Sequence, residues 1–161
     1  MKLEFGPRGT LLIDDAVITH RNFEGRGDKY NREGDRNFSV VIDDETIAER
    51  LQNDTNEHGV GWNVKIKPPR DEDAAPFMFL PVKVKINDRG PKVFLVTAGR
   101  VNELDEESLS ILDEIDIESV NLDIRPYDGI MSGKPFRSAY LQGIEVIQKI
   151  DRFTAKHADN Y

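Results

Sequence analysis

Short segments in which apolar and polar residues alternate recur along the whole chain, and they constrain its fold more than any other feature. Valine or isoleucine alternates with lysine in residues 62–67 and again in 79–86. A period of two is typical of a β-strand that buries one face. Further strand patterns lie at residues 11–18, 38–42, 92–97, 120–124 and 140–150. The alternation therefore predicts a mainly β protein built from these short strands.

Two segments have the residue spacing of helices instead. The first, residues 43–53, begins with two aspartates that can cap a helix, and Ile47 and Leu51 lie four residues apart on its inner face. The second, residues 104–115, has Asp105 as its cap and apolar residues along one side. A mainly β chain with two inserted α-helices fits a small, partly open OB-type barrel of five or more strands.

Length and residue types indicate one domain without a prosthetic group. A chain of 161 residues fits a single domain, which we place at residues 1–150, followed by a mobile tail at 151–161. The chain has no cysteine, and its three histidines show no metal-ligand spacing, so we expect no metal and no cofactor. It has no apolar run of membrane-spanning length and no signal-peptide pattern, so we expect an intracellular protein.

Charge is distributed unevenly along the chain. The net charge is −8, which taken alone argues against a polyanionic partner. Residues 101–123, however, sum to −9, whereas residues 60–100 sum to +4. The acidic residues concentrate in the segments that contain the expected helices, and the basic residues lie on expected strands. The strands can therefore present a basic surface although the whole chain is acidic.

A glycine-rich loop joins two expected strands between Ile18 and Phe38. It contains three glycines, five basic residues and two aromatic residues. Glycine lets the backbone approach a ligand closely, and arginine binds phosphate in a fork and stacks on flat rings. The loop also contains four acidic residues, so its net charge is 5 − 4 = +1, and a charged hairpin tip without a ligand is an alternative. The candidate nucleic-acid contacts in this loop are Arg21, Phe23, Arg26, Lys29, Tyr30, Arg32 and Arg36.

A second set of candidates follows from the alternating lysines. If residues 62–67 pair antiparallel with 79–86, the period of two places four lysines on one face of the sheet. Like charges opposite one another destabilise a sheet, and a phosphate backbone would neutralise them. The alternative is a solvated face that protects a sheet edge. The candidate contacts on this face are Lys65, Lys67, Lys83 and Lys85.

Aromatic residues close to basic ones support the nucleic-acid interpretation. Single strands are bound without sequence preference by a basic groove with aromatic platforms, at roughly 1–3 kcal/mol for each stacked base. Such neighbours occur late in the chain, where Tyr127 follows Arg125 and Phe136 precedes Arg137. The candidate contacts in this part of the chain are Arg125, Tyr127, Lys134, Phe136 and Arg137.

The sequence contains no catalytic signature, so we expect a protein that is not an enzyme. Carboxylates cluster at residues 43–45, 71–73 and 105–107 and could bind Mg²⁺ in a nuclease. Two of these clusters stand where helices are expected to begin, and helix capping accounts for them. There is no phosphate-binding loop, nucleophile elbow or Ser/His/Asp set. A metal-dependent nuclease is therefore our third hypothesis.

Several sequence blocks resemble those of OB-fold single-stranded DNA-binding proteins from tailed bacteriophages. Residues 29–42, with the sequence KYNREGDRNFSVVI, resemble the opening block of that family. The later blocks that resemble the family, in the same order, are residues 61–65, 80–84, 122–127 and 134–141. The resemblance covers about residues 10–150 of the chain.

This resemblance implies a protein that coats single-stranded DNA during phage replication or recombination, in the cytoplasm of the bacterial host and without a cofactor. Phage replication or recombination proteins would be further partners, and no membrane is implied. Proteins of this family often end in an acidic tail that recruits partners, whereas residues 156–161 contain a single aspartate. A second hypothesis, of a different class, is a protein-interaction or structural module whose acidic helices form the working surface.

Overall fold

The computed structural model describes residues 1–157 and consists mainly of β-strands. The strands are β1 (Lys2–Phe5), β2 (Leu11–Ala16), β3 (Ile18–Asn22), β4 (Arg36–Ile42), β5 (Lys65–Lys67), β6 (Phe77–Val84), β7 (Lys92–Thr97), β8 (Arg100–Leu104), β9 (Ile117–Met131) and β10 (Lys134–Gln148). The helices are α1 (Glu45–Asn53) and α2 (Arg152–Lys156), and the 3-10 helices are η1 (Pro7–Gly9) and η2 (Leu109–Asp113). The mainly β prediction is confirmed.

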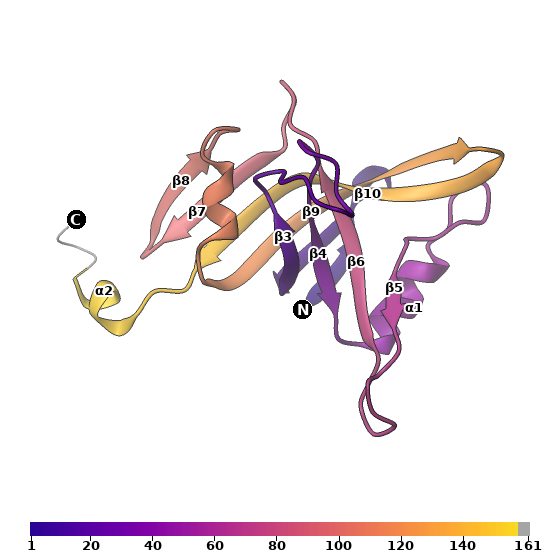
Figure 1. Cartoon of the computed structure of the whole chain (residues 1–161), viewed down its shortest axis with the longest axis horizontal. Helices are drawn as coiled ribbons and strands as arrows, with labels where there is room; N and C mark the ends of the chain where they lie inside the picture. Colours follow the sequence, from indigo (N-terminus) through magenta and orange to yellow (C-terminus); the bar gives the residue numbers. More distant parts are fainter. Residues whose placement is uncertain (158–161) are drawn as a thin grey trace.

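All ten strands described in residues 1–157 belong to one sheet. Its main path runs in the order β1-β2-β9-β10-β6-β4-β3, with β5 added to β6 and the β7–β8 hairpin added to β10. The sheet does not close, because β1 and β3 stand at the two ends of this path. Figure 1 shows β9 and β10, the longest strands, crossing the middle of the molecule, and the sheet continues from β10 through β6 and β4 to β3.

Alternation along each strand decides which side chains enter the core. In β6, Met78, Leu80, Val82 and Val84 are buried, whereas the residues between them point to the other face. Leu11 and Ile13 of β2, and Leu122 and Ile124 of β9, are buried in the same way. Each strand thus contributes one apolar face to the core, as a period of two requires.

The first expected helix is confirmed as α1. The side chain of Asp44 accepts a hydrogen bond of 2.7 Å from the backbone N–H of Thr46, which satisfies a free donor at the helix start. Ala48 and Leu51 face the core and are buried. The sequence predicted this helix because its cap and its apolar spacing are both local signals.

The second expected helix, over residues 104–115, is wrong. Residues 100–104 form β8, and Asp105 and Ser108 then exchange hydrogen bonds of 3.0 and 2.9 Å between the side chain of each and the backbone N–H of the other. Asp105 therefore closes a tight turn instead of starting a helix. The short η2 that follows buries Leu109 and Leu112, whose three-residue spacing matches the period of a 3-10 helix.

The strands expected at residues 120–124 and 140–150 are too short, because β9 and β10 continue through the residues between them as a hairpin. Pairing extends to Met131 opposite Lys134, and Ser132 and Gly133 form the turn with φ of 51° and 78°. Two successive positive φ values are typical of a tight hairpin turn. Pro126 is tolerated because β9 has passed the end of β2 there, which leaves one edge of the strand free.

Several smaller boundaries differ from the sequence prediction. The expected strand at 62–67 is reduced to β5, and β6 begins at Phe77 instead of residue 79. Residues 2–5, where no strand was expected, form β1 against β2. The expected mobile tail at 151–161 contains α2, and its last four residues lie outside the described residues.

Candidate nucleic-acid interface

The outward face of β6 carries aromatic and basic side chains in one row. Phe77, Phe79 and Lys83 alternate with the buried residues of this strand and share one face. Phe77 and Phe79 lie side by side, with ring centroids 5.4 Å apart. Since β6 has neighbours on both edges, this row lies on a rigid part of the sheet.

Strand β5 adds two lysines to this face. It pairs antiparallel with β6, with Lys65 opposite Phe79 and Lys67 opposite Phe77. The Nζ atom of Lys67 lies 5.7 Å from the centroid of the Phe79 ring. The expected common face is therefore confirmed for Lys65, Lys67 and Lys83, whereas Lys85 lies just after the end of β6. The register also explains how the sheet accommodates them, because each lysine of β5 is opposite an aromatic ring and not opposite another lysine.

The β9–β10 hairpin extends the face with further aromatic rings. Tyr140 pairs with Lys83 of β6 and with Arg125 of β9, and both cations lie against its ring, at 5.9 and 4.9 Å from the centroid. The ring of Tyr127 contacts Tyr140 edge to face at 5.6 Å, and Phe136 at 6.1 Å. A row of rings thus continues from the middle of the sheet out along the hairpin.

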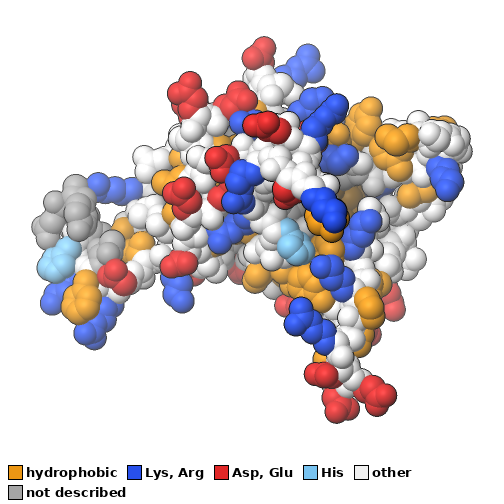
Figure 2. All heavy atoms as spheres, in the orientation of Figure 1, with side chains coloured by type: hydrophobic (Ala, Val, Ile, Leu, Met, Phe, Trp, Pro, Cys, Tyr) orange, Lys and Arg blue, Asp and Glu red, His pale blue; other side chains and the backbone are white. Residues whose placement is uncertain are grey.

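We refer to this surface as the aromatic–lysine face. It comprises Lys65, Lys67, Phe77, Phe79, Lys83, Arg125, Tyr127, Phe136 and Tyr140. Figure 2 shows hydrophobic and basic side chains intermixed over the middle of the molecule and along the β9–β10 hairpin. Its three lysines are exposed and its arginine, Arg125, is half-buried, so that four positive charges are available to a ligand.

A β-bulge brings a histidine to the same surface. The register between β3 and β4 shifts between Thr19 and Asn22, and His20 in this shift has a φ of 51°. A bulge turns a side chain away from the direction that regular alternation would give it. The His20 ring accordingly lies edge-on to Phe79 at 5.2 Å and to Phe77 at 6.3 Å.

Two adjoining grooves run beside the face. One, of about 600 Å³, lies between the glycine-rich loop, the end of β6 and the middle of β10, and Asn37, Lys83 and Tyr140 line it. The other, of about 340 Å³, is lined by Arg89 and Arg125, and Lys85 lines both grooves. Among the described residues that line them, five are basic and one, Asp35, is acidic. The grooves therefore form a basic channel next to the aromatic rings.

The glycine-rich loop is held by side-chain amides. The Asn22 side chain accepts hydrogen bonds from the backbone N–H groups of Gly25 and Arg26, at 3.0 and 2.9 Å. The Asn31 side chain donates to three backbone carbonyls of the loop, at 2.7, 3.2 and 3.0 Å. Tyr30 projects from this framework with 90% of its surface exposed. The candidate contacts Arg26, Lys29, Tyr30 and Arg32 are all exposed on this loop.

Two arginines of the candidate set have partners inside the protein. Arg21 donates two hydrogen bonds of 2.8 Å to backbone carbonyls at the end of η2. Arg36 donates to the carbonyl of Phe23 at 2.9 Å and forms an ion pair with Glu106 at 3.2 Å. Both guanidinium groups fix the loop to the rest of the chain, which is a structural role that the sequence did not reveal.

Arg137 is also engaged within the protein. Its side chain is 8% exposed and bonds Asp128 at 2.8 and 3.1 Å and the backbone carbonyl of Asp54 at 2.7 Å. It also covers the ring of Trp62 at 5.1 Å. The hydrogen bond from Arg137 holds the pKa of Asp128 below its usual range, so the carboxylate stays ionised beside it. Arg137 thus anchors the hairpin.

The assignment of Phe23 as a candidate contact is corrected. Phe23 is fully buried, and its ring stacks on Phe38 with centroids 5.2 Å apart. The backbone N–H groups of Phe23 and Glu24 donate to the side chain of Asp113 at 2.8 and 2.9 Å, which directs the chain inward. A glycine-rich neighbourhood suggested an exposed ring, but this long-range contact places it in the core.

The sequence analysis missed four residues that the structure brings to the interface. These are His20, Phe77, Phe79 and Tyr140. One signal was available, because Phe77 and Phe79 have the same odd numbering as Lys83 and therefore the same strand face. Tyr140 and His20 reach the face only through pairing with distant strands and through the bulge.

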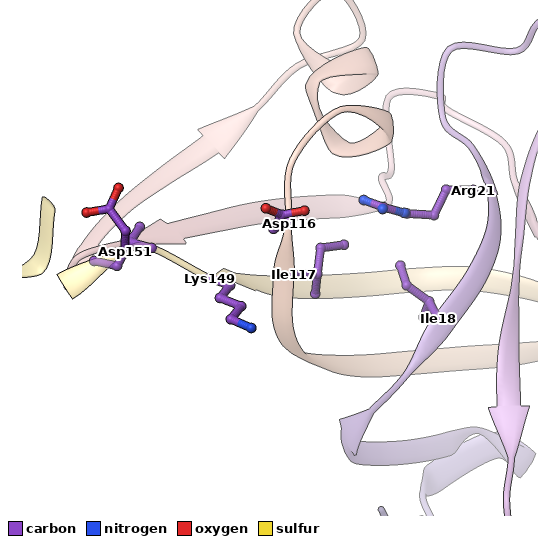
Figure 3. A pocket seen from close by; sticks show the side chains of 7 residues that line it. Ile18, Arg21, Asp116, Ile117, Lys149 and Asp151 are labelled. Carbon is purple, nitrogen blue, oxygen red and sulfur yellow. The ribbon is translucent and has the colours of Figure 1, made fainter. Parts of the chain in front are cut away.

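A third cavity lies away from the aromatic–lysine face. It has a volume of about 560 Å³ and lies between β3, the start of β9 and the end of β10. Figure 3 shows the Arg21 and Asp116 side chains on one side of it and Lys149 and Asp151 on the other. Its charged lining is of mixed sign, unlike that of the basic grooves.

Two further properties concern the described part of the chain. No group of three or more histidine, aspartate or glutamate side chains in it is arranged to hold a metal ion. Within residues 1–157, no helix combines the length and the apolar character needed to cross a membrane.

Aromatic rings alternating with cations on an open β-sheet define a class of protein, namely one suited to binding a single nucleic-acid strand. Comparison with known families agrees with this. The model of the phage ssDNA-binding domain family matches residues 3–160, and the chain belongs to this family. No curated protein sequence matches the chain.

Solved structures of the single-stranded DNA-binding protein from bacteriophage Enc34 share the fold. The form in complex with ssDNA has a TM-score of 0.56 at 12% identity, over 94% of this chain and 93% of that one. A second form has a TM-score of 0.55 at 13% identity, over 95% and 93% of the two chains. The C-terminal truncation has a TM-score of 0.55 at 13% identity, over 92% and 91%.

Proposed function

We propose that this protein binds and coats single-stranded DNA, largely independently of sequence, through the aromatic–lysine face. The observation that carries the proposal is the alternation of rings and cations on one surface of β5, β6, β9 and β10. Every base has a flat π-face, so stacking on aromatic rings tolerates any sequence, at roughly 1–3 kcal/mol for each base. Membership of the phage ssDNA-binding domain family supports the same ligand.

The strand would follow the row of rings. It would pass Phe77 and Phe79 between the lysines of β5, continue past Lys83 to Tyr140, and leave along Tyr127 and Phe136. The basic grooves beside β6 would hold its phosphates. Exposed Arg26, Lys29, Tyr30, Arg32 and Lys134 flank this route and would add contacts at its borders.

We further infer that the sheet is a partly open OB-type barrel. Its support is the position of β10, which pairs with β9 on one side and with β6 and β7 on the other, so that one continuous sheet bends around the core. OB-folds bind oligonucleotides on such a sheet and on the loops that flank it. In this proposal residues 1–150 form the binding domain and 151–161 a tail.

The setting we propose is phage DNA replication or recombination in the cytoplasm of the bacterial host. The protein would act there without catalysis or a cofactor, and other phage replication or recombination proteins would be its further partners. Family membership supports the phage setting. The route described above needs only stacking and charge, which is why no chemical step is required of the protein.

A titration with matched lysine variants tests this function. Fluorescence anisotropy of a labelled oligonucleotide would be measured for single-stranded and double-stranded DNA at several salt concentrations. The test variant replaces Lys65, Lys67 and Lys83 with glutamine. The control variant replaces Lys2, Lys92 and Lys149 with glutamine. These three lysines are exposed and lie off the face, and their replacement changes the net charge as much as the test variant does.

We expect the parent to prefer the single strand, with log K falling against log[salt] by about 0.7 for each phosphate neutralised. The test variant should bind more weakly and with a smaller slope, and the control should bind nearly as the parent does. Equal losses in the two variants would mean that only net charge matters. Absence of single-strand binding by the parent at low salt would contradict the function itself.

A further inference from the structure

We propose that the tip of the β9–β10 hairpin is a wedge for the terminal base pair at which single-stranded DNA meets a duplex. The ligand of this site would be a single-strand–double-strand junction, not a single strand alone. The proposal rests on the proposed function and extends it, because a strand on the aromatic–lysine face would be led toward this tip.

The hairpin has the form of a projecting arm. β2 pairs with β9 only as far as Ile124, whereas β9 and β10 stay paired with each other to Met131 and Lys134. Residues 126–137 therefore extend beyond the rest of the sheet as a two-stranded ribbon. Figure 1 shows this ribbon reaching outward past β5 and α1.

The end of the arm is apolar and exposed. Ile130 and Met131 show 61% and 70% of their surface to solvent. Lys134 is the single charged residue between Gly129 and Phe136. Figure 2 shows hydrophobic side chains gathered over the arm and a basic side chain near its end. Ile130 and Met131 are consecutive strand residues and lie on opposite faces of the arm, so both faces of its end are apolar, and Lys134 lies on the Met131 face. Such an end suits a ligand with a flat apolar surface and a nearby negative charge.

Contacts with the rest of the chain hold the base of the arm in place. Arg137 fixes its base through two ion pairs, to Asp128 at 2.8 Å and to Asp54 at 3.6 Å. The Phe136 ring lies directly on Gly129, where an added Cβ would come within 2.7 Å of it. We expect these contacts to keep the tip in position when it presses against a stacked base pair.

The tip is continuous with the proposed binding face. Met131 has the same strand parity as Tyr127 and Arg125, and its partner Lys134 has the same parity as Phe136. The row of rings therefore ends next to the proposed wedge. A single strand stacked on Tyr127 and Phe136 would bring the first base pair of an adjoining duplex against Met131, with Ile130 on the opposite face of the same tip.

The chemistry of the tip favours a duplex end over a protein partner. Proteins insert isoleucine, methionine and similar side chains between stacked bases, at a cost of a few kcal/mol for each unstacked step. An exposed terminal base pair offers an apolar plane bordered by phosphates, which matches a tip that is apolar on both faces and carries one lysine. A second copy of this chain, docked tip to tip, is the competing occupant and would bring two Lys134 side chains together.

The experiment compares two DNA ligands and two matched variants. One ligand is a single strand, and the other is a duplex that carries a single-stranded extension of the same length. A 2-aminopurine at the terminal base pair reports unstacking by its fluorescence. The test variant, I130T/M131T, keeps strand-forming residues at the tip. The control variant, V101T/I111T, removes two aliphatic residues outside the arm that are 61% and 40% exposed.

We expect the parent and the control to bind the junction about tenfold more tightly than the single strand, the value for one more buried aliphatic side chain. Both should raise the 2-aminopurine signal. I130T/M131T should bind the single strand as the parent does and lose both the preference and the signal. Equal affinity of the parent for the two ligands would overturn the wedge and leave single-strand binding intact. A change in sedimentation of the free protein on I130T/M131T, without loss of junction preference, would assign the tip to self-association.

Discussion

The aromatic–lysine face and the glycine-rich loop at residues 24–35 both present aromatic and basic side chains, but they are built in different ways. The face takes its members from four strands, and the sheet ladder holds them. The loop carries Lys29, Tyr30 and Arg32 within four residues, and the amide side chains of Asn22 and Asn31 hold it. The loop is conspicuous in the sequence, whereas the face exists only after the strands have paired.

This difference in how the two regions are held indicates which of them contributes more binding energy. Rings on the face already contact one another and their neighbouring cations, so little further ordering is needed when a strand binds. Tyr30 is almost fully exposed, and the Nζ atom of Lys29 lies 5.7 Å from its ring centroid. Ordering such a side chain on a ligand costs conformational entropy, which reduces the binding free energy that its stacking contributes. We therefore expect the face to dominate affinity and the loop to modify it.

The strongest test of this comparison removes two rings from the face. Tyr140→Ala combined with Phe79→Ala should weaken single-strand binding by roughly 2–6 kcal/mol, because two stacking platforms are lost. The loss should change little with salt, since stacking releases few ions. Anisotropy titrations would measure it, with Phe5→Ala, a ring 46% exposed on β1, as the control. A loss no larger than that of Phe5→Ala would mean that the rings of the face do not stack on bases.

A second test compares the anchors of the two regions. Arg137→Met keeps the contact with Trp62 but leaves Asp128 and Asp54 without their cation, and should lower the free energy of unfolding by about 1–3 kcal/mol. Asn31→Ala should loosen only the loop. Urea unfolding measures the first effect and hydrogen exchange the second. If Asn31→Ala destabilises the whole protein as much, the loop is part of the core structure.

The same ion pair predicts a dependence on pH. Because the folded-state pKa of Asp128 lies below its unfolded value of 3.8, its stabilisation is present above that pH and is lost as pH falls through the lowered pKa. Arg137→Met should remove this part of the acid sensitivity. The difference in unfolding free energy between parent and variant should therefore shrink below pH 3.8. A constant difference would contradict the role of the pair.

The third test compares one phosphate contact from each region. Lys83→Gln should reduce the slope of log K against log[salt] by about 0.7, the value for one phosphate on a single strand. Arg32→Gln on the loop should reduce it by much less. Titrations at four or more salt concentrations would separate the two. The reverse order would make the loop the main electrostatic contact.

The smallest effect is expected for the tip of the loop. Tyr30→Ala should weaken binding by less than about 1 kcal/mol, below the range for a fully stacked base. The fold should be unaffected, because exposed substitutions away from packing usually stay within about 0.5 kcal/mol. A loss equal to that of Tyr140→Ala would erase the distinction between the two regions.

Local patterns in the sequence were sufficient to predict one face of the sheet, the helix α1 and the family. Alternation of valine with lysine placed Lys65, Lys67 and Lys83 on one face, because strand geometry has a fixed period. The aspartate before residue 45 and the spacing of Ile47 and Leu51 predicted α1, because caps and helical spacing act within a few residues. The sequence blocks also indicated the family to which the chain belongs.

Only the tertiary structure decided which of the basic and aromatic residues remain available to a ligand. Arg21, Arg36 and Arg137 are engaged by carbonyls and carboxylates from distant parts of the chain, and Phe23 is buried against Phe38. Asp105 closes a turn with Ser108 where a helix cap was expected. Apart from the local Asp105–Ser108 turn, these outcomes depend on contacts between segments far apart in the sequence, and composition and spacing carry no information about such contacts. For the same reason, the row of rings from Phe79 to Tyr140 and Phe136 appears only when β6, β9 and β10 are brought together.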